Sequence, residues 1–298
     1  SFVMEYPEDM QALGFTEPLV LDSVPQRIVC LSAAPVLALY EMGANLVGIP
    51  TSRVVTLPED LVAATEPVQF SAMSSSDFDY ECIVELEADL VLVGSSSTEV
   101  GEQIESLGIP VYYVFAGHTV SYDNIKAQTE ALVKAFSLDE ASTAKGEEIM
   151  GRFTALEERL ASVQPTYADK KAMVLQSSDT ANHYIQTERG TLASMAAMMG
   201  FGNVYENETS SMAKLDMEQA LDYNPDLVLC VGGGTAEEHK ALMEQAFSEN
   251  EAYWNSIDAI KNGNVIYLPV EFCSTAGIHV IDNINELVDS IEAFYAEK

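Results

Sequence analysis

The chain has few basic residues. Its 298 residues include 14 lysines and arginines against 47 aspartates and glutamates, which gives a formal net charge of -33 at pH 7. Nucleic acids and anionic membrane surfaces are bound through clusters of lysine and arginine, so we expect neither as a partner. The same charge favours a basic docking partner, and it favours neutral or weakly charged small ligands over highly anionic ones.

Cysteine and histidine are also scarce, and they form no familiar metal or redox motif. There are four cysteines and four histidines, and no CxxC pair is present. A zinc finger or a thioredoxin-like site is therefore not expected. Cys30 and Cys230 lie in apolar runs typical of strands, so we expect buried free thiols that pack as small hydrophobic side chains.

Catalytic and membrane-spanning signatures are missing as well. The sequence has no GxGxxG, no P-loop lysine, no GxSxG and no HExxH motif, so the residues indicate no enzyme and no resident cofactor. The glycines 232–234 follow an apolar run, but a glycine-rich loop alone is a weak phosphate signal. No apolar stretch is long enough to cross a bilayer.

Two distant segments are similar to each other. Residues 80–94 and 217–232 both contain a glutamate, Glu81 or Glu218, and eight residues later an aspartate, Asp89 or Asp226, that begins the run Asp-Leu-Val-Leu. A repeat this widely spaced does not describe a solenoid, because solenoid periods are 20 to 50 residues. It predicts two similar lobes in one chain.

Short strand patterns and amphipathic helix patterns alternate on both sides of the chain's middle. Expected strands include residues 27–32, 46–49, 90–93 and 110–115 in the first half, and 171–176, 227–231 and 265–269 in the second. A C-terminal amphipathic helix is expected over residues 280–295. This order predicts an α/β fold of two Rossmann-like lobes with parallel-rich sheets. We expect residues 1–23 as a tether or surface segment, 24–120 as the N-terminal lobe, 121–165 as one long interlobe helix ended by Pro165, and 166–298 as the C-terminal lobe.

At this level the chain resembles a known family. The run from Pro25 to Ser32, the two repeated segments, residues 107–111 and residues 254–269 look like the substrate-binding proteins of ABC importers for cobalamin, siderophores and haem. The resemblance implies two α/β lobes joined by one long helix, with the ligand in a cleft between them. It also implies that Glu81 and Glu218, one from each lobe, dock onto arginines of the dimeric ABC permease; paired carboxylates suit a basic partner.

Ligand contacts are expected from loops at the carboxyl ends of the strands, because these loops converge at one edge of a parallel sheet. Aromatic residues alternate there with small polar ones, which suits a bulky ligand with an apolar body. The candidate cleft residues are Ser32, Ala33, Arg53, Phe70, Met73, Gly94, Ser95, Phe115, Gln176, Ser177, Tyr184, Gly233, Phe272 and His279.

Three of these residues bear on the identity of the ligand. In haem-binding members of the family, a methionine from one lobe and a histidine from the other hold the iron, and Met73 and His279 stand at matching positions. A Met/His axial pair is sound chemistry for haem. Arg53 could pair with a carboxylate of the ligand. A capping role for His279 and a surface role for Arg53 remain open.

The resemblance implies a protein that captures haem, a ferric siderophore or a corrinoid and delivers it to an ABC importer without chemistry. It would lie outside the cytoplasm, in the periplasm or as a cell-surface lipoprotein, and touch the membrane through a lipid anchor alone. Two alternatives stay open. One is a divalent-metal component of an importer, and the other is a sensor or adhesion module on the same fold.

Overall fold

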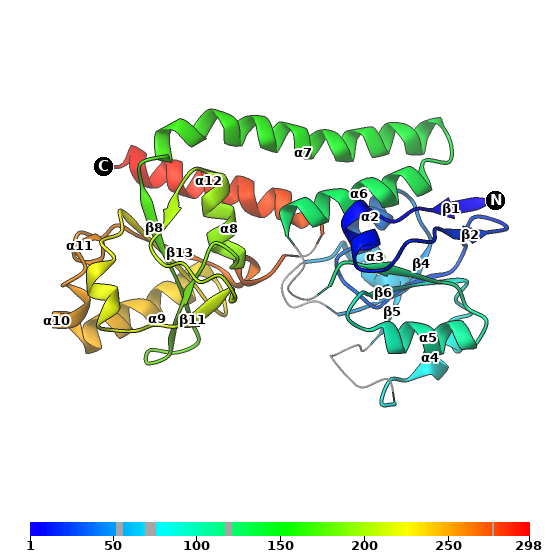
Figure 1. The fold of residues 1–298 in the computed structure, drawn as a ribbon, viewed down its shortest axis with the longest axis horizontal. Helices are drawn as coiled ribbons and strands as arrows, with labels where there is room; N and C mark the ends of the chain where they lie inside the picture. The colour runs from blue at the N-terminus through cyan, green and yellow to red at the C-terminus, as the bar shows by residue number, and fades with distance from the viewer. Residues whose placement is uncertain (52–55, 69–75, 117–120, 276) are drawn as a thin grey trace. The chain divides into compact units, whose positions relative to one another are not determined.

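The computed structural model describes residues 1–51, 56–68, 76–116, 121–275 and 277–298 (Figure 1). The chain divides into two compact units. Unit 1 contains Ser1–Thr154 and Thr275–Val280, and unit 2 contains Ala155–Ser274 and Ile281–Lys298. Three predicted ligand contacts, Arg53, Phe70 and Met73, lie outside the described residues.

Unit 1 is built on a parallel five-stranded sheet. Its order is β5 (Glu66–Pro67), β4 (Leu46–Ile49), β3 (Ile28–Cys30), β6 (Leu90–Gly94) and β7 (Val111–Val114). The connections carry the helices α2 (Val36–Glu41), α3 (Glu59–Ala64), α4 (Tyr80–Glu85) and α5 (Thr98–Ser106). Every residue of the central strands β3 and β6 is buried, as expected for parallel strands covered on both faces.

The first residues of the chain are folded onto unit 1. Strand β1 (Phe2–Met4) pairs antiparallel with β2 (Leu19–Leu21), and α1 (Glu8–Ala12) lies between them in the chain. Met10 is buried in the core of unit 1. The expected tether or surface segment over residues 1–23 is therefore a packed part of the unit. The apolar residues of this segment are spaced too irregularly for a periodicity argument to predict the packing.

Unit 2 contains a mixed sheet. Its order is β11 (Met212–Lys214), β9 (His183–Gln186), β8 (Lys171–Ser177), β12 (Leu227–Val231) and β13 (Val265–Leu268), with β10 (Gly202–Asn203) also paired to β8. Strands β8, β12 and β13 are parallel, whereas β9 runs antiparallel to both of its neighbours. The helical elements are α8 (Thr191–Met198), η2 (Gln219–Asp222), α9 (Ala236–Glu249), α10 (Glu251–Trp254), α11 (Asp258–Lys261), η3 (Val270–Cys273) and α12 (His279–Ala296).

The region expected to form one helix over residues 121–165 forms two. Helix α6 (Tyr122–Phe136) ends before residue 137, and α7 (Glu140–Tyr167) begins after a short break. In the break, Ser142 Oγ accepts hydrogen bonds from the backbone nitrogens of Leu138 (2.8 Å) and Asp139 (2.9 Å), and Ser142 N donates to Asp139 Oδ1 (2.7 Å). Such local side-chain bonds compete with helical ones and start a new helix.

Pro165 does not end α7 as predicted, because the helix continues to Tyr167. Proline removes one backbone hydrogen bond from a helix, and here the loss falls close to the helix end. The division between the units falls inside α7, between Thr154 and Ala155.

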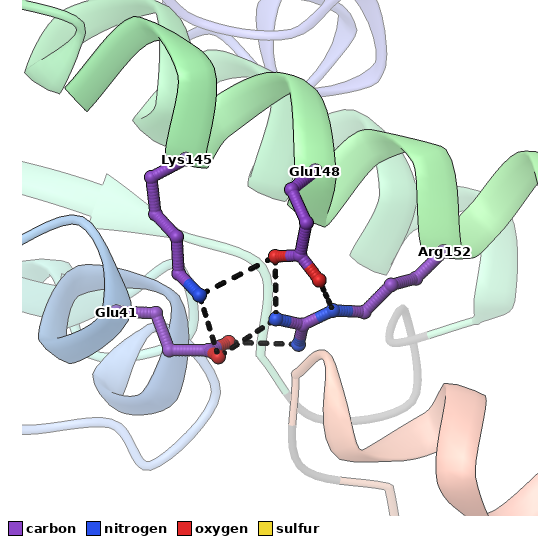
Figure 2. A network of polar contacts seen from close by, with 4 residues as sticks. All are labelled: Glu41, Lys145, Glu148 and Arg152. Carbon is purple, nitrogen blue, oxygen red and sulfur yellow. Dashed lines mark hydrogen bonds and ion pairs between the residues drawn. The ribbon is translucent and has the colours of Figure 1, made fainter. Parts of the chain in front are cut away.

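An arginine attaches α7 to another helix in each unit. In unit 1, Arg152 donates two hydrogen bonds to Glu41 of α2 (2.9 and 2.8 Å) and two to Glu148 of α7 (2.9 and 2.7 Å) (Figure 2). Lys145 Nζ lies 3.7 Å from the Glu41 carboxylate and 3.4 Å from the Glu148 carboxylate. Hydrogen bonds from Arg152 lower the pKa of Glu148 to about 2. These four side chains, Glu41, Lys145, Glu148 and Arg152, are called the α2–α7 network below.

In unit 2 the equivalent attachment is made by Arg159. Its guanidinium donates to Asn285 Oδ1 (2.8 Å) and to Asp289 Oδ1 (2.5 Å), both on α12. Helix α12 confirms the C-terminal amphipathic helix predicted from the spacing of Ile284, Leu287 and Ile291, which are fully buried.

The α2–α7 network predicts a measurable loss of stability when its arginine is removed. Arg152→Met should lower the free energy of unfolding by about 1–3 kcal/mol, because bidentate charge-assisted bonds to a partly buried carboxylate are lost. Urea unfolding at pH 7 measures this. Lys240→Met is the control, because the exposed pair of Lys240 and Glu244 (3.9 Å) should contribute less than about 0.5 kcal/mol. Equal effects of the two substitutions would contradict the role of the network.

Candidate ligand-binding and docking sites

The two repeated segments fold in the same way at their glutamates. In unit 1, Asp79 Oδ1 accepts a hydrogen bond from the backbone nitrogen of Glu81 (3.1 Å) at the start of α4. In unit 2, Asp216 Oδ1 accepts from the backbone nitrogens of Glu218 and Gln219 (both 3.0 Å). An aspartate two residues before each glutamate therefore caps the turn that carries it. Asp79 and Asp216 thus extend the repeat by one residue at its N-terminal side.

The second aspartate of each repeat fixes the start of a neighbouring strand. The Asp89 carboxylate accepts from the backbone nitrogens of Gln26 (2.7 Å) and Arg27 (2.8 Å), just before β3. The Asp226 carboxylate accepts from the backbone nitrogen of Lys171 (2.7 Å), the first residue of β8. Backbone hydrogen bonds join the same residues in the opposite direction. Asp89 N donates to Arg27 O (2.9 Å), and Asp226 N donates to Lys171 O (2.8 Å). These contacts are called the aspartate clamps.

The turn before each aspartate clamp requires a left-handed backbone. Glu87 has φ 51° and Asn224 has φ 44°, and each lies two residues before its aspartate. Asparagine tolerates this conformation better than glutamate does. The equivalence is hidden in the sequence because the two side chains differ.

Exchanging these two residues tests the shared turn. Glu87→Asn should raise the free energy of unfolding by about 0.5–1 kcal/mol, and Asn224→Glu should lower it by a similar amount, because only one side chain suits a positive φ. Thermal unfolding measures both changes. A common sign for the two substitutions would contradict the equivalence.

Glu81 and Glu218, the predicted docking residues, are both exposed. Within the described part of the chain, neither carboxylate makes a hydrogen bond or an ion pair, whereas the backbone nitrogens of both residues donate to the capping aspartates. Each unit therefore presents an unpaired glutamate carboxylate at the matching position of an ordered turn. Such a group can accept charge-assisted hydrogen bonds from a basic partner.

The predicted ligand residues of unit 1 follow the carboxyl ends of the strands. Ser32 and Ala33 come after β3 and are partly exposed, and Ser95 follows β6. Gly94 ends β6, where an added Cβ would lie 2.8 Å from the Cβ of Ala116. Phe115 follows β7 but is buried in the core of unit 1. Its ring is therefore not presented to a ligand in this structure.

Unit 2 places its predicted ligand residues at the corresponding edge. Gln176 and Ser177 end β8, Gly233 follows β12, and Phe272 lies in η3 after β13. Tyr184 on β9 is 39% exposed and Phe272 is fully buried. The exposed residues of this set, such as Tyr184, can contact a ligand, whereas the ring of Phe272 is buried and cannot.

The described part of the structure does not bring the two predicted iron ligands together. His279 begins α12 and is partly exposed, and Met73 lies outside the described residues. In the described ranges, no group of three or more histidine, cysteine, aspartate or glutamate residues could hold a metal ion. Haem ligation by His279 and Met73 therefore stays a prediction.

Arg189 is a candidate ligand contact that the sequence analysis missed. It lines an open cavity of about 680 Å³ in unit 2, together with Thr187, Glu188, Glu206, Asn207 and Glu208. Arg189 is exposed and makes no ion pair with the residues that the structure describes. Its guanidinium could pair with a carboxylate of a ligand. The scarcity of basic residues was the available signal, and the sequence analysis applied it to Arg53 alone.

Two buried histidines lie beneath the glycine loop of unit 2. His239 is 1% exposed, and neither of its ring nitrogens has a hydrogen-bond partner among the described residues. The ring of His183 instead contacts Ser177 Oγ (2.7 Å) and Thr180 O (3.0 Å). Burial lowers the pKa of both rings, and the nearby His183 lowers that of His239 further. An added Cβ on Gly232 would lie 2.5 Å from His239 Cε1.

The lowered histidine pKa values predict acid sensitivity. The unfolded chain binds more protons than the folded chain below a pH of about 6.5, so stability is full above that pH and falls as the pH drops through it. His239→Leu should make the loss between about pH 6.5 and 5 shallower, with unchanged or higher stability at pH 7, because it removes a buried polar ring without partners. Urea unfolding between pH 5 and 8 measures this.

His183→Leu is the matched control for the second histidine. It should cost about 1–3 kcal/mol at pH 7, because Ser177 Oγ loses its buried partner. An unchanged pH profile in His239→Leu would show that His239 does not contribute to the acid loss.

The pattern of the family described as periplasmic binding protein matches residues 28–271 of the chain. The chain belongs to the periplasmic binding protein family. This periplasmic binding protein is 21% identical over 277 residues to the high-affinity heme uptake system protein IsdE of Staphylococcus aureus strain MRSA252, covering 91% of the chain and 88% of that relative.

Solved structures of similar proteins show the same fold. The iron uptake ABC transporter substrate-binding protein PiuA from Streptococcus pneumoniae Canada MDR_19A matches with a TM-score of 0.70 at 20% identity, over 96% of both chains. The vitamin B12 binding protein BtuF of Vibrio cholerae matches with a TM-score of 0.63 at 16% identity, over 91% of this chain and 98% of that one.

These findings confirm two predictions. The resemblance to substrate-binding proteins of ABC importers is confirmed by the family match, and the α/β class with parallel-rich sheets is confirmed by the fold. Members of this family are the substrate-binding components of transport systems. Among the described helices of this periplasmic binding protein, none combines the length and the apolar character needed to cross a membrane.

Proposed function

We propose that the protein captures an iron complex, haem or a siderophore, or a corrinoid outside the cytoplasm and delivers it to an ABC importer. The observation that carries this proposal is the duplicated docking turn. Glu81 and Glu218 are exposed, capped by equivalent aspartates and unpaired within the described residues. Two equivalent carboxylates suit a dimeric permease that offers the same basic group twice.

The class of ligand is supported by the similar proteins and by the cation of unit 2. Their names specify heme uptake, iron uptake and vitamin B12 binding. Haem and corrinoids are bulky apolar ring systems that carry carboxylate or amide side groups. Arg189 lines the open cavity of unit 2 and makes no ion pair with the described residues, so its guanidinium is suited to such a group.

Haem is the ligand that the predicted residues favour. Met73 and His279 would supply the axial ligands, and a Met/His pair gives a low-spin spectrum distinct from that of a single histidine. Attachment to the outer surface through a lipid anchor belongs to the same proposal. It rests on the family rather than on residues of this chain.

A spectroscopic titration tests the proposal. Haemin, a ferric hydroxamate siderophore and cobalamin are each added to the purified protein. Haemin should give a shifted Soret band that His279→Ala alters. Arg189→Gln should weaken binding about tenfold, because it removes one charge-assisted contact.

Lys240→Gln is the matched control for the titration, because it removes an exposed cation that is not a candidate ligand residue and should leave binding unchanged. Binding of cobalamin or the siderophore without a haemin shift would remove haem but retain the transport class. Failure to bind any of the three would contradict the proposed function.

A further inference from the structure

Two glutamine side chains on neighbouring strands of unit 2 are joined by a hydrogen bond. Gln186 on β9 donates from Nε2 to Gln176 Oε1 on β8 (2.8 Å). In the sheet, Gln176 is paired with Tyr184, which lies two residues before Gln186 on β9. Residues two apart on a strand point to the same face, and so do residues opposite each other in an antiparallel pair. The three side chains therefore share one face of the sheet, while Leu175 and Ile185 pack into the core on the other.

Helix α8 holds the Gln186 amide from a second side. Gln186 Oε1 accepts a hydrogen bond from the backbone nitrogen of Ala193 (3.0 Å), which lies in the first turn of α8. The first N–H groups of a helix have no partner within the helix, and here the amide of a 1% exposed glutamine supplies one. Gly190 permits this approach, because an added Cβ there would lie 2.5 Å from Gln186 Oε1. The bonds from Ala193 to Gln186 and from Gln186 to Gln176 are called the glutamine relay below.

The glutamine relay determines which end of each amide faces its neighbour. A backbone N–H group can only donate, so the atom of Gln186 that faces Ala193 is the oxygen. The nitrogen of Gln186 therefore faces Gln176, and the Gln176 atom that it meets is the oxygen. The free end of the Gln176 amide is then Nε2, which carries two N–H donors. Gln176 is partly exposed, and its Nε2 makes no hydrogen bond with any residue that the structure describes.

The surroundings of Gln176 indicate what this donor meets. Gln176 is the second-last residue of β8, at the carboxyl end of the parallel strands, and Tyr184 opposite it is 39% exposed. A donor amide therefore lies beside an accessible aromatic ring. The chain offers 14 basic residues against 47 acids, so an oxygen acceptor meets few cations on this protein and a neutral donor supplies an alternative partner. This combination suits a ligand with an apolar ring body and oxygen acceptors at its edge.

We propose that the glutamine relay fixes Gln176 as a hydrogen-bond donor to a carboxylate or carbonyl oxygen at the edge of a ring-shaped ligand, whose apolar body lies against Tyr184. Gln176 touches the ligand, and Gln186 is a positioning residue that acts through Gln176. This inference deepens the proposed function, on which it rests. It adds a residue that selects oxygen acceptors on the ligand, independently of any bond to a metal.

A titration of variants tests the donor. Kd is measured from absorption spectra of the full chain with haemin, cobalamin and a ferric hydroxamate siderophore. Gln176→Met should raise the Kd of haemin about tenfold, because a hydrogen bond to an ionised carboxylate is lost. For cobalamin the expected rise is about threefold, because its peripheral acceptors are neutral amide carbonyls. The size of the effect therefore distinguishes the two sources of the oxygen.

The positioning role of Gln186 has a separate readout. Gln186→Met should raise the Kd of haemin about threefold, because the Gln176 amide can then turn either end toward the ligand. The double variant should bind haemin like Gln176→Met alone, because Gln186 acts through Gln176. Independent effects would instead multiply to a rise of about thirtyfold.

The chain supplies a matched control on α9. Gln245 is exposed and donates to Glu249 Oε1 (2.9 Å), and Gln245→Met should leave every Kd unchanged. Thermal unfolding verifies that each variant folds. A measurement on the unchanged protein tests the relay without any substitution. In amide-exchange NMR, the side-chain N–H protons of Gln186 should exchange slowly and those of Gln176 rapidly, because the first are buried and bonded and the second are free.

Each contrary outcome overturns a defined part of the proposal. An unchanged Kd in Gln176→Met, with haemin or cobalamin bound by the original protein, overturns the donor and leaves the transport function intact. A multiplied effect in the double variant, or fast exchange at Gln186, overturns the relay. Binding of the siderophore alone overturns the ring-shaped occupant. Binding of none of the three compounds contradicts the proposed function itself.

Discussion

Both units depend on the aspartate clamps. A carboxylate that accepts backbone N–H groups is a strong, directional contact, and here it joins the β6 start to the β3 start and the β12 start to the β8 start. At the centre of each sheet, two neighbouring strands are therefore joined through the same residue type at the same position of the repeat. The turn that carries Glu81 or Glu218, which we propose for docking, lies directly before the clamp in the chain, so the clamp also restricts the position of that turn.

The two units share the clamped pair of parallel strands and differ in the strands around it. Unit 1 completes its sheet with parallel strands, whereas unit 2 adds the antiparallel strands β9 and β11. These additions bring Arg189 and the buried His183 to unit 2 alone. In the proposed function, docking uses the turns that the two units have in common, and ligand choice uses the loops in which they differ.

The sequence predicted the strongly patterned parts of this fold and missed the weakly patterned ones. Buried parallel strands such as β6 and β12 are continuous apolar runs, and helix α12 has a regular apolar face, so both were predicted correctly. Strand β9 is short and mixes polar with apolar residues, and the break before α7 depends on Ser142 and Asp139 side chains. The caps at Asp79 and Asp216 consist of one and two hydrogen bonds, respectively, and produce no periodicity in the sequence. Ligand residues were chosen by their place after a strand, which does not distinguish the buried Phe115 from the partly exposed Ser32.

Helix α7 carries the division between the units inside an unbroken helix, with an arginine anchor on either side of it. Arg152 and Arg159 are seven residues apart, which is about two turns. Inserting or deleting one residue between them would rotate one anchor by about 100° relative to the other. The helix can therefore tolerate changes of side chain across this stretch more readily than changes of length. The number of residues between Arg152 and Arg159 therefore constrains the anchors of both units together.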